Sequence, residues 1–290
     1  NKAALQNMEM NPQVAFSDSV QAGIYMKHPR KVRIKADMID KMDYDKILSM
    51  YNDRFKDASD FTFIFVGNAD VEQMKPLIEE YLGALPSINR KETFKDNKID
   101  MRQGIYKNEF IRKQETAKAS NFVLLNGDCK YDLRNNILLN MTCQILDLVY
   151  TAKVREDEGG TYGVYVGGQL IKYPEEKAIL QVIFETAPEK REKLMKIIFA
   201  ELENITKAGP SETDLNKVKE FMLKKHTEDM KENRYWLNSI DEYLFTGMNP
   251  IKDYDRIVNS VTVKDIQKFA DELFKQKNEI EVSMISPEEK

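Results

Sequence analysis

The feature that most constrains the fold is a long helical stripe in the middle of the chain. Apolar residues recur there at three- and four-residue steps: Leu133, Ile137, Leu138, Met141, Ile145, Leu148 and Ala152. This is the period of a helix with one apolar face, and it runs too long for a strand. A helix of this length needs a broad apolar surface to pack against, so we expect a sheet beside it.

Strand-like segments lie on both sides of this stripe. Apolar and β-branched residues alternate or cluster in residues 105–111, 120–125, 161–171, 178–185 and 280–285. Glycines at 159 and 160 turn the chain from the helix into a strand, and a turn containing Pro174 makes a hairpin with the next strand. Residues 189–275 are mainly helical. This order predicts an α+β domain, with an antiparallel sheet and helices packed on one face.

The first hundred residues have a different pattern. Residues 61–66 (FTFIFV) predict a buried strand, and a helix follows over residues 71–82 with Asp70 as its N-cap. The polar stretch after Leu85 predicts a linker. We therefore expect the C-terminal part of an α+β domain in residues 1–92, a linker in 93–103 and a complete α+β domain in 104–290. The first part seems too small to close a sheet, which predicts a domain cut open at residue 1.

Composition excludes several classes of function. The 44 basic and 48 acidic residues nearly cancel and are interspersed, so we expect no nucleic-acid partner. No uninterrupted apolar run approaches the roughly 20 residues that cross a bilayer, so we expect no membrane span. The first residues do not resemble a signal peptide. Cys129 and Cys143 are too few for a disulfide framework and are not spaced as a metal motif.

The histidine count limits the chemistry of the chain. Only His28 and His226 are present, and neither H-E-x-x-H nor H-x-x-E-H occurs, so no two-histidine zinc site is expected. We expect His28 to face solvent beside Pro29 and His226 to pack on an apolar helix face. A serine or cysteine nucleophile would need a histidine base, and no G-x-S-x-G elbow is present. The chain alone predicts no catalytic site.

One segment points to a family. The long helix ends in Val-Arg-Glu at residues 154–156, two glycines follow, and Thr-Tyr-Gly-Val opens the next strand at 161–164. This arrangement resembles the C-terminal-half signature of M16 (insulinase/pitrilysin-like) zinc metallopeptidases. Residues 61–70 and the stretch 77–86, which closes on Tyr-Leu-Gly-Ala-Leu-Pro, are similar to the strand-then-helix passage of the same family.

The resemblance implies a fold and a function. Members have two halves of two α+β domains each, which close around an unfolded peptide, with the zinc motif in the first domain. This chain would be the end of the third domain and the complete fourth. Zinc would then be bound by the N-terminal half, which would be the partner of this chain, and the chain alone would be inactive.

The resemblance also implies site residues. Arg155 and Tyr162 would hydrogen-bond carbonyl groups of a peptide substrate near the zinc-bound water, and Gly160 and Thr161 would contact the substrate beside them. Guanidinium and phenol groups are suitable donors to a developing oxyanion. In the simpler alternative, Arg155 pairs with the neighbouring acidic residues and Tyr162 only packs on the sheet.

Two other functions remain open. The chain could be a non-catalytic peptide-binding or assembly subunit of the same fold, or an unrelated α+β interaction domain. The sequence does not set the compartment, and a bacterial cell envelope or periplasm is the expectation carried forward.

Overall fold

A five-stranded sheet organises residues 104–290. The computed structural model describes residues 2–156 and 163–287, apart from the side chains of residues 155 and 156. The strands are β1 (Ile105–Ile111), β2 (Lys118–Asp128), β3 (Val164–Ile171), β4 (Lys177–Thr186) and β5 (Glu279–Ser286), in the order β1-β5-β2-β4-β3. Each lies at a segment that the sequence predicts as a strand.

The sheet is antiparallel except at one edge. β2 pairs antiparallel with β4 and with β5, and β3 pairs antiparallel with β4. β1 runs parallel to β5, with Ile105 opposite Glu279 and Ile111 opposite Ile285. The prediction of antiparallel pairing therefore holds for β2 to β5. β1 differs because its partner is the last strand of the domain, reached only after the whole helical layer has been crossed.

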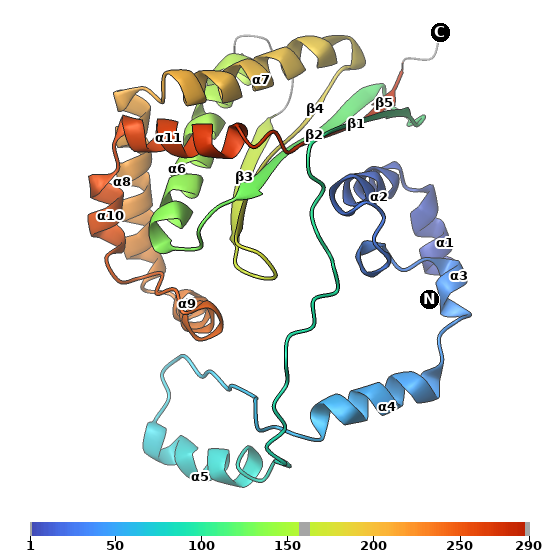
Figure 1. Cartoon of the computed structure of the whole chain (residues 1–290), viewed down its shortest axis with the longest axis vertical. Helices are drawn as coiled ribbons and strands as arrows, with labels where there is room; N and C mark the ends of the chain where they lie inside the picture. Colours follow the sequence, from blue (N-terminus) through green and yellow to red (C-terminus); the bar gives the residue numbers. More distant parts are fainter. Residues whose placement is uncertain (1, 157–162, 288–290) are drawn as a thin grey trace.

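One face of the sheet carries the main helical layer (Figure 1). It contains α6 (Leu133–Tyr150), α7 (Arg191–Lys207), α8 (Glu212–Asp229) and α11 (Val263–Phe274), with α9 (Asn233–Thr246) and α10 (Tyr254–Ser260) beside them. The predicted N-cap Ser211 accepts a hydrogen bond from the amide of Asp214, and Thr262 and Asp265 form a capping box. Ile137, Met141 and Ile145 of α6 are at most 1% exposed, because α6 lies between the sheet and α8.

The opposite face is covered from the N-terminal end of the chain. After α1 (Lys2–Met10), helix α2 (Pro12–Tyr25) lies across this face and contributes Phe16 and Ile24 to a core with Phe122, Ile280 and Val282 of the sheet. Two short elements follow, η1 (Pro29–Lys31) and α3 (Ala36–Ile39). The predicted layer of helices on one face is thus joined by one helix on the other. Sequence analysis did not detect α2.

The segment between these helices and the sheet has no core of its own. Neither α4 (Tyr44–Phe55) nor α5 (Val71–Tyr81) contains a buried residue. The prediction for α5 is confirmed, because Asp70 accepts hydrogen bonds from the amides of Glu72 and Gln73.

The predicted buried strand at residues 61–66 is wrong. These residues form no strand, and Phe61, Phe63 and Phe65 are 38%, 46% and 53% exposed. Their composition favours an extended chain, but a strand also needs a neighbour to complete its hydrogen bonds. No described residue pairs with this segment.

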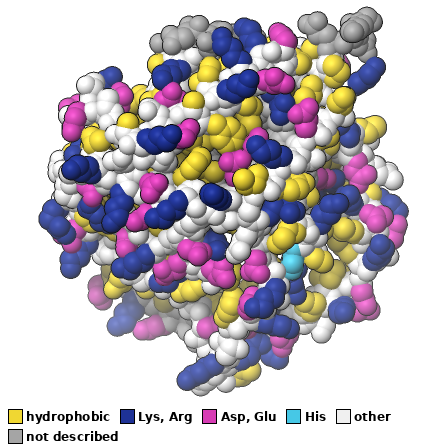
Figure 2. Space-filling view, turned by 45° about the horizontal axis from the view of Figure 1, so that its top comes forward, with side chains coloured by type: hydrophobic (Ala, Val, Ile, Leu, Met, Phe, Trp, Pro, Cys, Tyr) yellow, Lys and Arg dark blue, Asp and Glu magenta, His cyan; other side chains and the backbone are white. Residues whose placement is uncertain are grey.

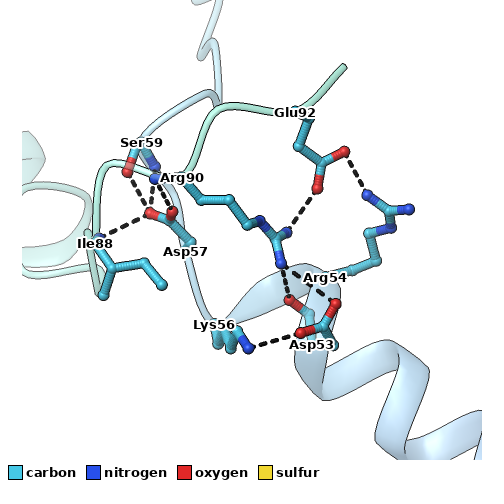
Figure 3. Close-up of polar contacts among 8 residues, drawn as sticks. All are labelled: Asp53, Arg54, Lys56, Asp57, Ser59, Ile88, Arg90 and Glu92. Carbon is cyan, nitrogen blue, oxygen red and sulfur yellow. Dashed lines mark hydrogen bonds and ion pairs between the residues drawn. The ribbon is translucent and has the colours of Figure 1, made fainter. Parts of the chain in front are cut away.

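A polar network fixes the end of α4 to the segment that leads to β1 (Figure 3). The carboxylate of Asp57, 1% exposed, accepts hydrogen bonds from the amides of Ile88 at 3.0 Å and Arg90 at 2.7 Å, and from the Ser59 hydroxyl. The Arg90 guanidinium donates to the carbonyl of Asp53 and to the carboxylate of Glu92. Residues 86–92 are therefore held in place before the chain crosses to the sheet.

Helix length and hydropathy give one result relevant to a membrane. The continuous helical stretch Leu133–Val154 is long and apolar enough to cross a bilayer, which the search for an uninterrupted apolar run did not indicate. Of its most apolar window, 56% is buried inside the fold, and α6 packs along β3. This burial is typical of the core helix of a globular domain.

Candidate functional site

The turn predicted to carry the site lies between α6 and β3. After Tyr150 the helix continues as a π-helical turn, η2 (Thr151–Glu156), whose backbone includes Arg155. Such wide turns are rare and recur at functional sites. The side chain of Arg155, and Gly160, Thr161 and Tyr162, lie outside the described residues. The structure therefore defines the two ends of the turn and leaves the four predicted roles untested.

The first end of the turn is anchored to α7. The Tyr150 hydroxyl donates to the carbonyl of Ile198 at 3.0 Å, and burial raises the pKa of Tyr150 well above its ordinary value, so the group stays a donor. The Lys153 ammonium lies 2.5 Å from the carboxylate of Glu201. Val154 is fully buried in the main core. The backbone on the N-terminal side of Arg155 is thus fixed by three contacts.

The second end is anchored to the sheet. Val164 opens β3, is 8% exposed and pairs with Phe184 of β4. Further along β3, a Cβ added at Gly168 would lie 2.8 Å from Cys143 Sγ and 2.8 Å from Leu139 Cγ of α6. Real Cβ contacts are not that short, so glycine is what allows α6 to approach β3 here. This close packing sets the spacing of the two elements that the turn joins.

The described residues do not form a zinc site. They contain no group of three or more His, Cys, Asp and Glu side chains that could hold a metal ion. His28 is partly exposed and caps η1, where its Nδ1 accepts from the Arg30 amide. His226 is 7% exposed, as predicted for a packed residue. Zinc ligands need close donors, and these two histidines lie on separate elements with different partners.

The structure reveals one polar pair that sequence reasoning missed. Nδ1 of His226 lies 2.9 Å from a carboxylate oxygen of Asp255, at the start of α10. The two residues are 29 positions apart, so no local spacing indicates the pair. Elsewhere charge is dispersed, and Figure 2 shows acidic and basic side chains interspersed over one face of the molecule.

Solved structures with the same fold define the class of protein. The crystal structure of the periplasmic protease PqqL from Escherichia coli has a TM-score of 0.80 and 16% identity, covering 99% of this chain and 32% of that one. A peptidase M16 inactive domain from Pseudomonas fluorescens has a TM-score of 0.75 and 18% identity, covering 99% and 68%. The fold is that of M16-type peptidase domains.

Sequence comparison identifies the family. Residues 41–222 match the family described as the Peptidase M16 inactive domain, and the chain belongs to that family. A curated zinc protease PQQL-like protein from Arabidopsis thaliana is 26% identical over 250 residues, covering 80% of this chain and 26% of the relative. The chain thus spans about a quarter of that relative's length.

Proposed function

We propose that this chain is the C-terminal, zinc-free half of a zinc metalloendopeptidase and forms one wall of a closed chamber in which peptides are hydrolysed. The observation that carries the proposal is the match of residues 41–222 to the inactive domain of the M16 family. The similarity to a zinc protease-like protein supports zinc as the metal. Because this chain lacks a zinc site among its described residues, the N-terminal half of the same protein would bind the metal.

The proposed contribution of this half is hydrogen bonding to the substrate. Arg155 and Tyr162 would donate to substrate carbonyl groups and to the oxyanion that develops on the carbonyl under attack, while Gly160 and Thr161 contact the peptide backbone. Donors fixed before the reaction stabilise such charge most, since they need not reorganise. The contacts of Tyr150 and Lys153 with α7, and the pairing of Val164 in the sheet, support a fixed frame for these donors.

We further propose the domain division 1–92, 93–103 and 104–290. In this division the first part belongs to an α+β domain completed by the N-terminal half, and α2 is where that domain packs on the next one. Large exposed apolar side chains on one stretch support it: Tyr44, Ile47, Leu48, Tyr51, Phe55, Phe61, Phe63, Phe65, Val71, Leu77 and Tyr81. Apolar surface of this extent is typical of an interface.

Reconstitution tests the proposal directly. The purified chain should neither bind zinc stoichiometrically nor cleave peptides, and cleavage should appear when the N-terminal half is added. In the reconstituted enzyme, Arg155→Ala and Tyr162→Phe should each lower kcat/KM by about 10²–10³, as expected for loss of one oxyanion donor. Arg256→Ala and Tyr165→Phe, at residues that are exposed in the structure, are matched controls that should leave kcat/KM unchanged.

Other outcomes would identify other functions. Peptide binding without cleavage in the reconstituted pair would favour a non-catalytic binding or assembly subunit. Unchanged kcat/KM in both site variants would refute the donor role. A periplasmic location is proposed from the similarity in fold to a periplasmic protease, and cell fractionation of the native host tests it.

A further inference from the structure

A second polar site lies in the helical layer, on the side away from the sheet. A cavity of about 140 Å³ is lined by residues of α6, α8, α9 and α10, among them Phe221, Lys225, His226, Asp229, Tyr235 and Tyr254. None of these residues takes part in the proposed peptidase function. The cavity therefore needs an explanation of its own.

His226 is the reason to regard this cavity as a binding site. Its side chain is 6% exposed, and Nδ1 lies 2.9 Å from the carboxylate of Asp255. Because Nδ1 faces a carboxylate, it carries the proton, and Nε2 is left as a hydrogen-bond acceptor. Among the described residues, Nε2 is buried and has no hydrogen-bond partner. Buried polar atoms are normally paired, so a group that donates a hydrogen bond is expected here.

The surroundings select the charge of that group. The ring of Tyr254 lies 4.2 Å from the imidazole, centroid to centroid, and the ring of Tyr235 lies 5.8 Å away. Lys225 and Asp229 form an ion pair, so their charges offset each other. The carboxylate of Asp255 behind the imidazole leaves one negative charge in excess. Aromatic rings beside a net negative charge favour a cation over an anion.

The volume selects the size. An apolar cavity of about 150 Å³ can hold a benzene molecule, so this cavity has room for about five or six non-hydrogen atoms. We propose that it binds a primary alkylammonium group, which donates a hydrogen bond to Nε2 of His226 and lies against Tyr235 and Tyr254. A free small amine and the end of a lysine side chain of a peptide share this chemistry.

The histidine count makes the test direct. In a His28→Gln variant of the chain, His226 is the only histidine, so its imidazole C–H signals in an NMR spectrum need no assignment. Titration with n-butylammonium chloride at pH 7.5 should shift these signals saturably. Butyrate and n-butanol, which match the probe in size but lack its charge, should not. An acetylated pentapeptide with one lysine, compared with its norleucine analogue, separates the two sources.

Two variants connect the binding to the proposed contacts. His226→Phe should abolish n-butylammonium binding measured by calorimetry. Asp255→Asn, at a side chain that is 61% exposed and should not affect folding, should weaken it about fivefold, the size expected for one charge removed near a partly solvated cation. The proposal is overturned if no amine shifts the His226 signals saturably, if butyrate or n-butanol shifts them equally, or if Asp255→Asn binds like the parent chain.

Discussion

Replacing Gly168 with alanine tests whether close packing of α6 on β3 holds the frame of the peptidase site. The new Cβ would lie 2.8 Å from Cys143 Sγ and from Leu139 Cγ, whereas carbon atoms in contact prefer about 3.5–4.0 Å. Both side chains are nearly buried, at 5% and 1% exposure, so neither can move into solvent. Helix and strand must separate by close to an ångström.

The cost follows from that overpacking. Extra methylene-sized groups in a packed core destabilise by about 1–3 kcal/mol. For a chain of this size each kcal/mol lowers Tm by roughly 2–4 °C, so we expect Tm of Gly168→Ala to fall by about 4–8 °C in thermal denaturation followed by circular dichroism. In the reconstituted enzyme, kcat/KM should fall as well, since the turn joins the two displaced elements.

Matched variants make this result decisive. A Cβ at Gly163, next to the turn, would meet no atom within 4 Å, so Gly163→Ala should leave Tm nearly unchanged. Leu139→Ala should cost less free energy in the Gly168→Ala background than alone, with a coupling of about 1 kcal/mol. Equal Tm values for the two glycine variants would show that α6 and β3 are not held apart by this contact.

Three further predictions concern stability and pH. Tyr150→Phe should lower the free energy of unfolding by about 1 kcal/mol, the usual value of one hydrogen bond, because the carbonyl of Ile198 loses its donor; urea denaturation measures this. The hydroxyl of Ser59, followed by backbone amides, holds the pKa of Asp57 well below its usual range. The stabilisation is therefore present at neutral pH and is lost only as pH falls below the ordinary carboxyl range, and Asp57→Asn should speed tryptic cleavage after Arg90 at pH 8. Burial, followed by the neighbouring carboxyl of Glu281, raises the pKa of Glu279 to about 7; its charged form is disfavoured in the folded chain, so stability should fall as pH rises from about 4.5 to 7, and Glu279→Gln should flatten that slope in urea denaturation.

Local signals explain most of what could be predicted. The side chain of Asp70 caps α5 through amides two and three residues away, and that spacing can be read from sequence. The strands of residues 104–290 alternate or cluster apolar residues over their own length, and a short connection joins β3 to β4. Such features depend on neighbours in the chain, which the sequence contains.

Features that depend on distant residues could not be predicted. Residues 61–66 have the composition of a strand, but pairing depends on a partner that composition does not reveal. Helix α2 buries Phe16 and Ile24 only because the sheet presents Ile280 more than 250 residues later. The role of Arg155 came from a motif and not from geometry, and the contact of His226 with Asp255 joins two helices that no spacing rule connects.

The position of β5 has a consequence for how the chain is made. β5 lies between β1 and β2 and pairs with both, so the first strand of the domain has no neighbour in the sheet until residues 279–286 have been synthesised. Contacts between such distant residues slow folding. While the ribosome completes the domain, β1 and the apolar side of β2 remain unprotected, which is the condition under which nascent chains aggregate or recruit chaperones. Ribosome-bound chains that stop before residue 279 should therefore remain protease-sensitive throughout the second domain.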